Sequence, residues 1–128
     1  MIVDSSALLA IIFREPGYAR LVEIMRNAAL VAAGAPTLAE TAIVLRSRVE
    51  ASDGLLERFL DEFDIEEVPF GEVHWREAVR AFRIYGKGRH AAQLNFGDCM
   101  TYAVASLTGE PLLFTGDDFT HTDLERAE

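Results

Sequence analysis

Four acidic residues are the strongest candidates for chemistry in this chain, because each falls where a predicted strand ends or a predicted helix begins. These residues are Asp4, Glu40, Asp98 and Asp117. Each position also has a structural explanation. Asp4 and Asp98 could cap helices, Asp117 could belong to a turn, and Glu40 follows Thr37 at the three-residue spacing of a capping box. Taken singly, the structural explanation is the simpler one.

The four acids are more informative as a group, because strand ends and helix starts meet at one edge of a parallel sheet. Glu40 also shares a helix stripe with Ile43, Val44 and Ser47. We therefore expect its side chain to point toward the sheet. Carboxylates that converge repel one another unless a cation compensates their charge. Oxygen ligands without histidine or cysteine favour Mg²⁺ or Mn²⁺, and such ions commonly act on phosphate esters.

Strands and helices are predicted to alternate along the whole chain. Apolar runs predict strands at residues 1–4, 30–33, 65–70 and 111–114, with a further edge strand at 122–124. Helical spacing predicts helices at residues 5–13, 18–29, 37–49, 55–63, 72–85 and 98–107. This alternation is typical of βαβ units. We therefore expect a single α/β domain over residues 1–128, with three α/β/α layers around a short parallel sheet of four to five strands.

Charge is unevenly distributed along the chain. The balance of 12 basic and 21 acidic residues gives a net charge of −9, which argues against binding nucleic acid by bulk electrostatics. The predicted helix at 72–85 and the loop after it nevertheless carry a basic stripe: Arg76, Arg80, Arg83, Lys87 and Arg89. Beside it runs a face that we expect to be buried: Trp75, Ala78, Val79, Phe82 and Tyr85. The stripe is either an RNA-backbone contact or a solvated surface paired with the acidic residues before it.

Composition places further limits on the protein. Half of the residues are hydrophobic, which is more than a small monomer easily buries. We therefore expect a homodimer or a permanently bound protein partner. The longest apolar run, residues 7–13, is too short to span a bilayer. The acidic Asp4 stands where a signal peptide would need basic residues. We therefore expect a cytoplasmic protein without membrane contact. The single cysteine, Cys99, is expected to serve packing. Three histidines are expected at the surface: His74, His90 and His121.

Four segments of the chain resemble the PIN-domain nucleases, and within them the VapC-type toxins of toxin–antitoxin pairs. The segments are Val3-Asp4-Ser5-Ser6-Ala7-Leu8, Thr37-Leu38-Ala39-Glu40, Leu94-Asn95-Phe96-Gly97-Asp98-Cys99 and Pro111-Leu112-Leu113-Phe114-Thr115-Gly116-Asp117-Asp118-Phe119. The resemblance covers the whole chain, and its last two segments are the most specific. At position 115 this chain has threonine where some similar toxins carry lysine.

The resemblance implies a role for each acid and an activity for the chain. It implies that Asp4, Glu40, Asp98 and Asp117 bind one or two Mg²⁺ or Mn²⁺ ions, that Ser6 supports Asp4, and that Asp118 is an auxiliary. The implied protein is a dimeric endoribonuclease that cleaves transfer or ribosomal RNA with a metal-activated water. A cognate antitoxin, whose tail occupies a groove of the toxin, would hold it inactive.

Three other interpretations share some of these features. A non-catalytic module of the same fold would use the acids as helix caps and an apolar groove to hold a partner. A receiver domain has a similar length and an acidic Mg²⁺ pocket, but it needs a lysine after a late strand, and the only lysine here is Lys87. A phosphatase of the haloacid dehalogenase type would need an aspartate where Ser6 stands.

Overall fold

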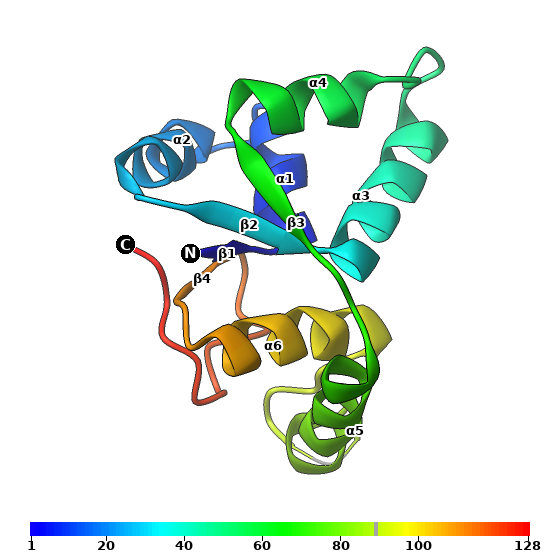
Figure 1. Ribbon diagram of the computed structural model, residues 1–128, viewed down its shortest axis with the longest axis vertical. Coiled ribbons are helices and arrows are strands. Elements are labelled where there is room, and N and C mark those ends of the chain that lie inside the picture. The colour runs from blue at the N-terminus through cyan, green and yellow to red at the C-terminus, as the bar shows by residue number, and fades with distance from the viewer. Residues whose placement is uncertain (89) are drawn as a thin grey trace.

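The computed structural model describes residues 1–88 and 90–128. Within this part of the chain, four short strands form one sheet: β1 (Ile2–Val3), β2 (Val31–Gly34), β3 (Ile65–Val68) and β4 (Leu112–Leu113). The order is β3-β2-β1-β4, and every pair is parallel. Helices cover both faces of the sheet (Figure 1). The predicted three-layer α/β architecture is therefore confirmed.

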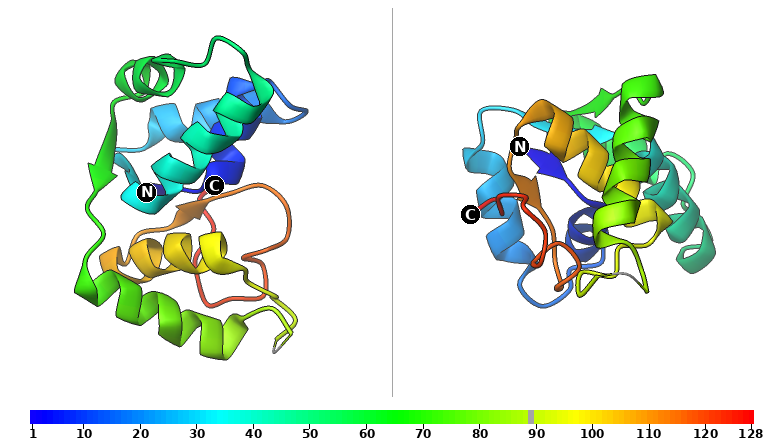
Figure 2. Two further views of the ribbon diagram at one scale, coloured as in Figure 1. Left: turned by 90° about the vertical axis from the view of Figure 1, so that its right-hand side faces the viewer. Right: turned by 90° about the horizontal axis from the view of Figure 1, so that it is seen from below.

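Six helices are present among the described residues. They are α1 (Ser5–Ile12), α2 (Tyr18–Asn27), α3 (Ala35–Arg48), α4 (Leu55–Glu62), α5 (Glu72–Tyr85) and α6 (Phe96–Thr108). Figure 1 shows α1, α2 and α4 on one side of the sheet, with α5 and α6 on the other. Two turned views show α5 packed along α6 (Figure 2). Helix α3 contacts both α1 and α6, so it connects the two layers.

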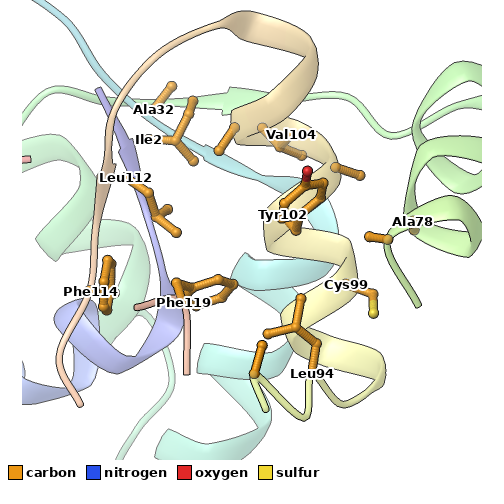
Figure 3. Close-up of a cluster of buried hydrophobic side chains, with 14 residues drawn as sticks. Ile2, Ala32, Ala78, Leu94, Cys99, Tyr102, Val104, Leu112, Phe114 and Phe119 are labelled. Atoms are coloured by element: carbon orange, nitrogen blue, oxygen red, sulfur yellow. The ribbon is translucent and has the colours of Figure 1, made fainter. Parts of the chain in front are cut away.

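A buried cluster of apolar side chains occupies each face of the sheet. One cluster joins Leu8 of α1, Met25 of α2 and Phe59 of α4 to the sheet. The other holds Tyr102, Phe114 and Phe119 between α6 and the strands (Figure 3). Strand β2 approaches α6 so closely that a Cβ atom at Gly34 would lie 2.7 Å from Val104 Cγ2. Tight packing of this kind fixes α6 relative to the strands.

The order of the strands determines where a site can form. After β1 the chain adds β2 and then β3 on one side of β1, and it later returns to add β4 on the other side. This reversal of direction is the switch point at which α/β sheets usually bind ligands, beyond the carboxyl ends of the strands. Asp4 directly follows β1, and residues 115–118 follow β4. The fold therefore brings the first and last predicted acids to the same edge.

The predicted edge strand at residues 122–124 is wrong. Thr122 and Asp123 form bends and Leu124 has no regular structure, and the C-terminal segment joins the sheet only through an isolated bridge between Leu112 and Arg126. The bridge is held by two hydrogen bonds of 2.9 Å, from Leu112 N–H to the Glu125 carbonyl and from Ala127 N–H to the Leu112 carbonyl. The segment therefore covers the β4 edge without forming a strand.

The predicted buried face of α5 is also wrong in part. Ala78 and Ala81 are buried against α6, whereas Trp75, Val79 and Phe82 are 47%, 54% and 40% exposed. The small alanine side chains let α5 and α6 approach closely. The contact between the two helices covers only part of the apolar surface of α5. Helix α5 therefore carries an apolar stripe at the protein surface.

Two other expectations concern membrane contact and the cysteine. None of the helices in the described part of the chain combines the length and apolar character needed to cross a membrane. Cys99 is buried in the core cluster of α6, and burial raises the pKa of its thiol to about 11. The thiol is therefore protonated at neutral pH, in agreement with the predicted packing role.

Candidate functional site

Asp4 is the buried member of the acidic group, with 5% of its surface exposed. It is the N-cap of α1, and its Oδ2 accepts a 3.1 Å hydrogen bond from the Ser6 N–H. Its Oδ1 accepts a 2.8 Å bond from the Thr101 hydroxyl of α6. The Ser6 hydroxyl accepts a 3.1 Å bond from the Thr115 N–H. Asp4 is therefore both a helix cap and a fixed carboxylate, and Ser6 connects it to the segment that follows β4.

Glu40 lies at the surface of α3, in a position that differs from the predicted one. Helix α3 begins at Ala35 after Gly34, so Glu40 is not part of an N-terminal capping box. Ile43, on the same stripe, is 69% exposed, which shows that this stripe faces solvent rather than the sheet. Glu40 Oε1 instead accepts a 2.6 Å hydrogen bond from the Ser5 hydroxyl. Its carboxylate also contacts the start of α6, where a Cβ atom at Gly97 would overlap with Oε2.

Asp98 occupies the first turn of α6 and combines a structural role with an electrostatic one. Its N–H donates to Asn95 Oδ1 at 2.9 Å, and its Oδ2 accepts from the Asn95 N–H at 3.1 Å, which completes a capping box. Burial raises the pKa of Asp98 to about 6, with smaller contributions from the negative charges of Asp118, Asp4 and Glu40. These three carboxylates therefore act on Asp98 from three other segments of the chain.

Asp117 and Asp118 lie in the exposed turn after β4 and line a cavity of about 360 Å³ together with Asp98. Lys87 and His121 line the same cavity. Among the charges that raise the pKa of Asp98, that of Asp118 is the largest. The structure thus brings both residues to the site, and of these two it is Asp118 whose charge raises the pKa of Asp98.

The donor set fits a hydrated divalent cation. Among the described residues, no three histidine, cysteine, aspartate or glutamate side chains form a ready set of direct metal ligands. Mg²⁺ commonly binds through one or two carboxylates and keeps several of its waters, so it does not require such a set. A cation between Asp98 and its neighbours would compensate the repulsion that adds to the effect of burial on the pKa of this carboxyl.

The predicted RNA-binding residues have different surroundings. Arg76 forms a 2.8 Å ion pair with Glu72 and lies over the Trp75 ring, and Arg80 is held by Glu77 on the same helix. Arg83 and Lys87 are exposed. Arg89 lies outside the described residues. Two of the basic side chains are therefore compensated within α5, and the role of the stripe stays a prediction.

Sequence reasoning named Ser6 as a support for Asp4, but it did not identify three other hydroxyl residues near the acids. Ser5 holds Glu40, and Thr101 holds Asp4. The side-chain oxygens of Thr37 and Thr101 are 3.0 Å apart. The partners in the last two contacts are 97 and 64 residues apart in the chain. No local spacing could therefore have indicated them.

Comparison with known proteins connects this geometry to a family. The family model described as PIN domain matches residues 1–124. The chain is 43% identical to ribonuclease VapC42 of Mycobacterium tuberculosis, covering 99% of this chain and 98% of that one. It is 47% identical to ribonuclease VapC36 of the same organism, covering 98% and 91%.

Two solved structures share the fold at low sequence identity. VapC20 of Mycobacterium tuberculosis, described as a sarcin–ricin loop cleaving toxin, has a TM-score of 0.78 at 14% identity, covering 96% of this chain and 95% of that one. VapBC2 of Rickettsia felis, bound to a DNA fragment from its promoter, has a TM-score of 0.76 at 15% identity, covering 99% and 96%. The receiver and phosphatase interpretations gain no support from these comparisons.

Asp98→Asn is expected to stabilise the metal-free protein at neutral pH. The pKa of about 6 lies above the ordinary value of 3.8, so folding favours the protonated carboxyl. The stabilisation from this group is complete below about pH 4 and is lost as the pH rises through 6. Asparagine keeps an acceptor for the Asn95 N–H without the charge. We expect a gain in the free energy of unfolding on the order of 1 kcal/mol at pH 7 after solvent screening.

Thermal unfolding in EDTA checks this pH dependence. The variant should have the higher Tm at about pH 7.5, and the two Tm values should converge near pH 4. A difference that stays constant between these pH values would contradict the raised pKa assigned to Asp98.

Proposed function

The chain belongs to the PIN-domain family, and within it to the VapC ribonucleases of toxin–antitoxin modules; from that premise we propose that it is an endoribonuclease that depends on Mg²⁺ or Mn²⁺. The observation that carries the proposal is the convergence of carboxylates on the start of α6, where Asp98 lines a cavity with Asp117 and Asp118 and Glu40 lies against Gly97. Burial and the charges of Asp118, Asp4 and Glu40 together raise the pKa of Asp98. Mutual repulsion of this kind is unfavourable for stability alone and is useful where a cation binds.

The residues that would hold the cation are Asp4, Glu40 and Asp98, with Asp117 or Asp118 as the fourth. When bound, the ion supplies Lewis-acid chemistry, because it neutralises charge on the phosphate and lowers the pKa of a water. Asp4 is held by donors on both of its oxygens, so it contributes a fixed position. Asp117 and Asp118 are exposed at the cavity and are available to accept a proton from water.

The substrate would be transfer RNA or ribosomal RNA in the cytoplasm. The cavity that Asp98 lines with Asp117 and Asp118 also includes Lys87, a cation at the end of the basic stripe. Phosphates entering there would meet Lys87 first, and Arg83 would extend the contact along α5. Arg76 and Arg80 would have to leave their glutamate partners to join it.

A cleavage assay tests the proposed function. Purified protein is incubated with a mixed pool of transfer and ribosomal RNA in Mg²⁺, Mn²⁺ or EDTA, and the products are mapped. We expect cleavage with either metal, none in EDTA, and none by Asp98→Asn. Asp61→Asn, an exposed carboxylate of α4, is the matched control and should cleave normally. Metal-independent activity, or full activity of Asp98→Asn, would contradict the proposal, and no cleavage at all would favour a non-catalytic module.

Gly97→Ala tests whether the position of Glu40 matters for cleavage. A Cβ atom at residue 97 would overlap with Glu40 Oε2. The glutamate can rotate away, so we expect an unchanged or higher Tm, since alanine is the better helix residue. Cleavage should fall about tenfold or more, because the carboxylate is displaced. Gly71→Ala, where a Cβ atom would meet nothing within 4 Å, is the control. Normal cleavage by Gly97→Ala would remove Glu40 from the site.

The cognate antitoxin would bind the groove between α1, α2 and α4, which has a volume of about 590 Å³. Its floor includes Ile11, Val22 and Phe59, and its rim carries Arg14, Arg26 and Arg58. An apolar segment with acidic side chains complements such a groove. Arg58→Glu should weaken antitoxin binding in a pull-down while RNA cleavage persists. Arg20→Glu, outside the groove, is the control, and equal binding by both variants would place the antitoxin elsewhere.

A second copy of the chain would cover the hollow between α3 and α6. This hollow, about 380 Å³, is lined mainly by apolar side chains, including Ile43, Val44, Phe96 and Met100. Ile43 is 69% exposed and Phe96 is 79% exposed. Large apolar side chains gathered at a surface are typical of association sites. Sedimentation should therefore give a dimer for the wild type and a monomer for Ile43→Glu, and a monomeric wild type would contradict this arrangement.

A further inference from the structure

We propose that Thr101 is a positioning residue of the acidic site, and that Thr37 orients it, so that a buried pair of hydroxyl groups fixes the Asp4 carboxylate. This inference rests on the proposed function, because it assigns a role in cation binding to residues that do not themselves bind the cation. The observation behind it is a hydrogen-bonded connection between α3, α6 and the end of β1.

The connection lies entirely in the interior. Thr37 is 3% exposed, Thr101 is 1% exposed and Asp4 is 5% exposed. The Thr37 and Thr101 side-chain oxygens are 3.0 Å apart, and the Thr101 oxygen is 2.8 Å from Asp4 Oδ1. Thr101 follows Asp98 by three residues on α6. One turn of α6 therefore carries both Asp98, which lines the cavity, and Thr101, which holds Asp4.

The direction of each hydrogen bond follows from counting protons. Thr101 has a single hydroxyl proton, and it donates that proton to Asp4 Oδ1. Thr101 must then accept from Thr37, which donates its own proton. The hydroxyl of Thr41, fully buried one turn later on α3, donates to the Thr37 carbonyl at 2.8 Å and takes no part in the pair. The order is therefore Thr37 to Thr101 to Asp4.

This order has a consequence for Asp4. With the Ser6 N–H on Oδ2 and the Thr101 hydroxyl on Oδ1, both oxygens are fixed, and the carboxylate plane cannot rotate. Each oxygen keeps a further lone pair for a cation. Partners that orient a metal-binding carboxylate typically change metal affinity by about 10- to 100-fold when they are removed. Loss of the Thr101 hydroxyl should therefore weaken cation binding and leave RNA binding unchanged.

The experiment measures Mn²⁺ binding to the full chain by calorimetry, separately from RNA cleavage. Thr101→Val keeps the branched shape and removes the hydroxyl. We expect its Mn²⁺ affinity to fall about tenfold or more, with a lower kcat and an unchanged KM for RNA. Thr101→Ser, which restores the hydroxyl, should recover most of the affinity. A loss of packing alone would lower the Tm of both variants and leave the affinity of the folded protein unchanged.

Two further variants keep the inference falsifiable if Thr101→Val does not fold. Thr37→Val leaves the bond to Asp4 but removes the group that orients it, so Mn²⁺ affinity should fall by a smaller factor. Thr41→Val is the matched control, a buried threonine of α3 outside the pair, and should bind Mn²⁺ as the wild type does. Wild-type affinity in both Thr101→Val and Thr37→Val, or an equal loss in Thr41→Val, would overturn the inference. A wild type that binds no Mn²⁺ and cleaves no RNA would overturn the proposed function as well.

Discussion

Repulsion among carboxylates at the end of β1 is the constraint on which the rest of the site depends. Burial already disfavours the ionised form of Asp98, and the charges of Asp118, Asp4 and Glu40 add to that cost. The fold tolerates the repulsion because the participating side chains are held by short polar contacts. Asp4 accepts two hydrogen bonds, Glu40 accepts one from Ser5, and Asp98 belongs to a capping box. If the site acts as proposed, it exchanges stability for the capacity to bind a cation.

The scaffold meets this constraint through close approach of its elements. The strands are only two to four residues long. Helices α1 and α3 begin within two residues of the strands that precede them. Gly34 lets β2 approach α6, and Gly97 lets α6 approach Glu40. Any larger residue at either position would need its neighbour to move. The positions of the acids therefore depend on these two glycines, which have no side chain, as well as on the contacts of the acids themselves.

The sequence predicts the order of elements and the group of acids well, because both depend on local patterns. Helix α5 has the predicted limits, and Asp4 lies between the first strand, which ends one residue earlier than predicted, and α1. The orientation of Glu40 and the exposure of Trp75 could not be predicted, because each depends on which neighbour the helix meets. Contacts such as Thr101 with Asp4 join residues 97 positions apart. The resemblance pointed to Ser6, but only the folded chain shows that Ser5 and Thr101 reach the acids.

The two edges of the sheet determine how molecules of this chain can meet. Strand β3 forms one edge, and its exposed Glu66 and Glu67 place two like charges where another strand would have to pair. At the other edge, β4 is already engaged by the C-terminal segment through Leu112 and Arg126. Charged or covered edges of this kind oppose growth of a sheet from one molecule to the next. Pairing of strands between molecules is therefore disfavoured at both edges, which leaves the helix surfaces for contacts between molecules.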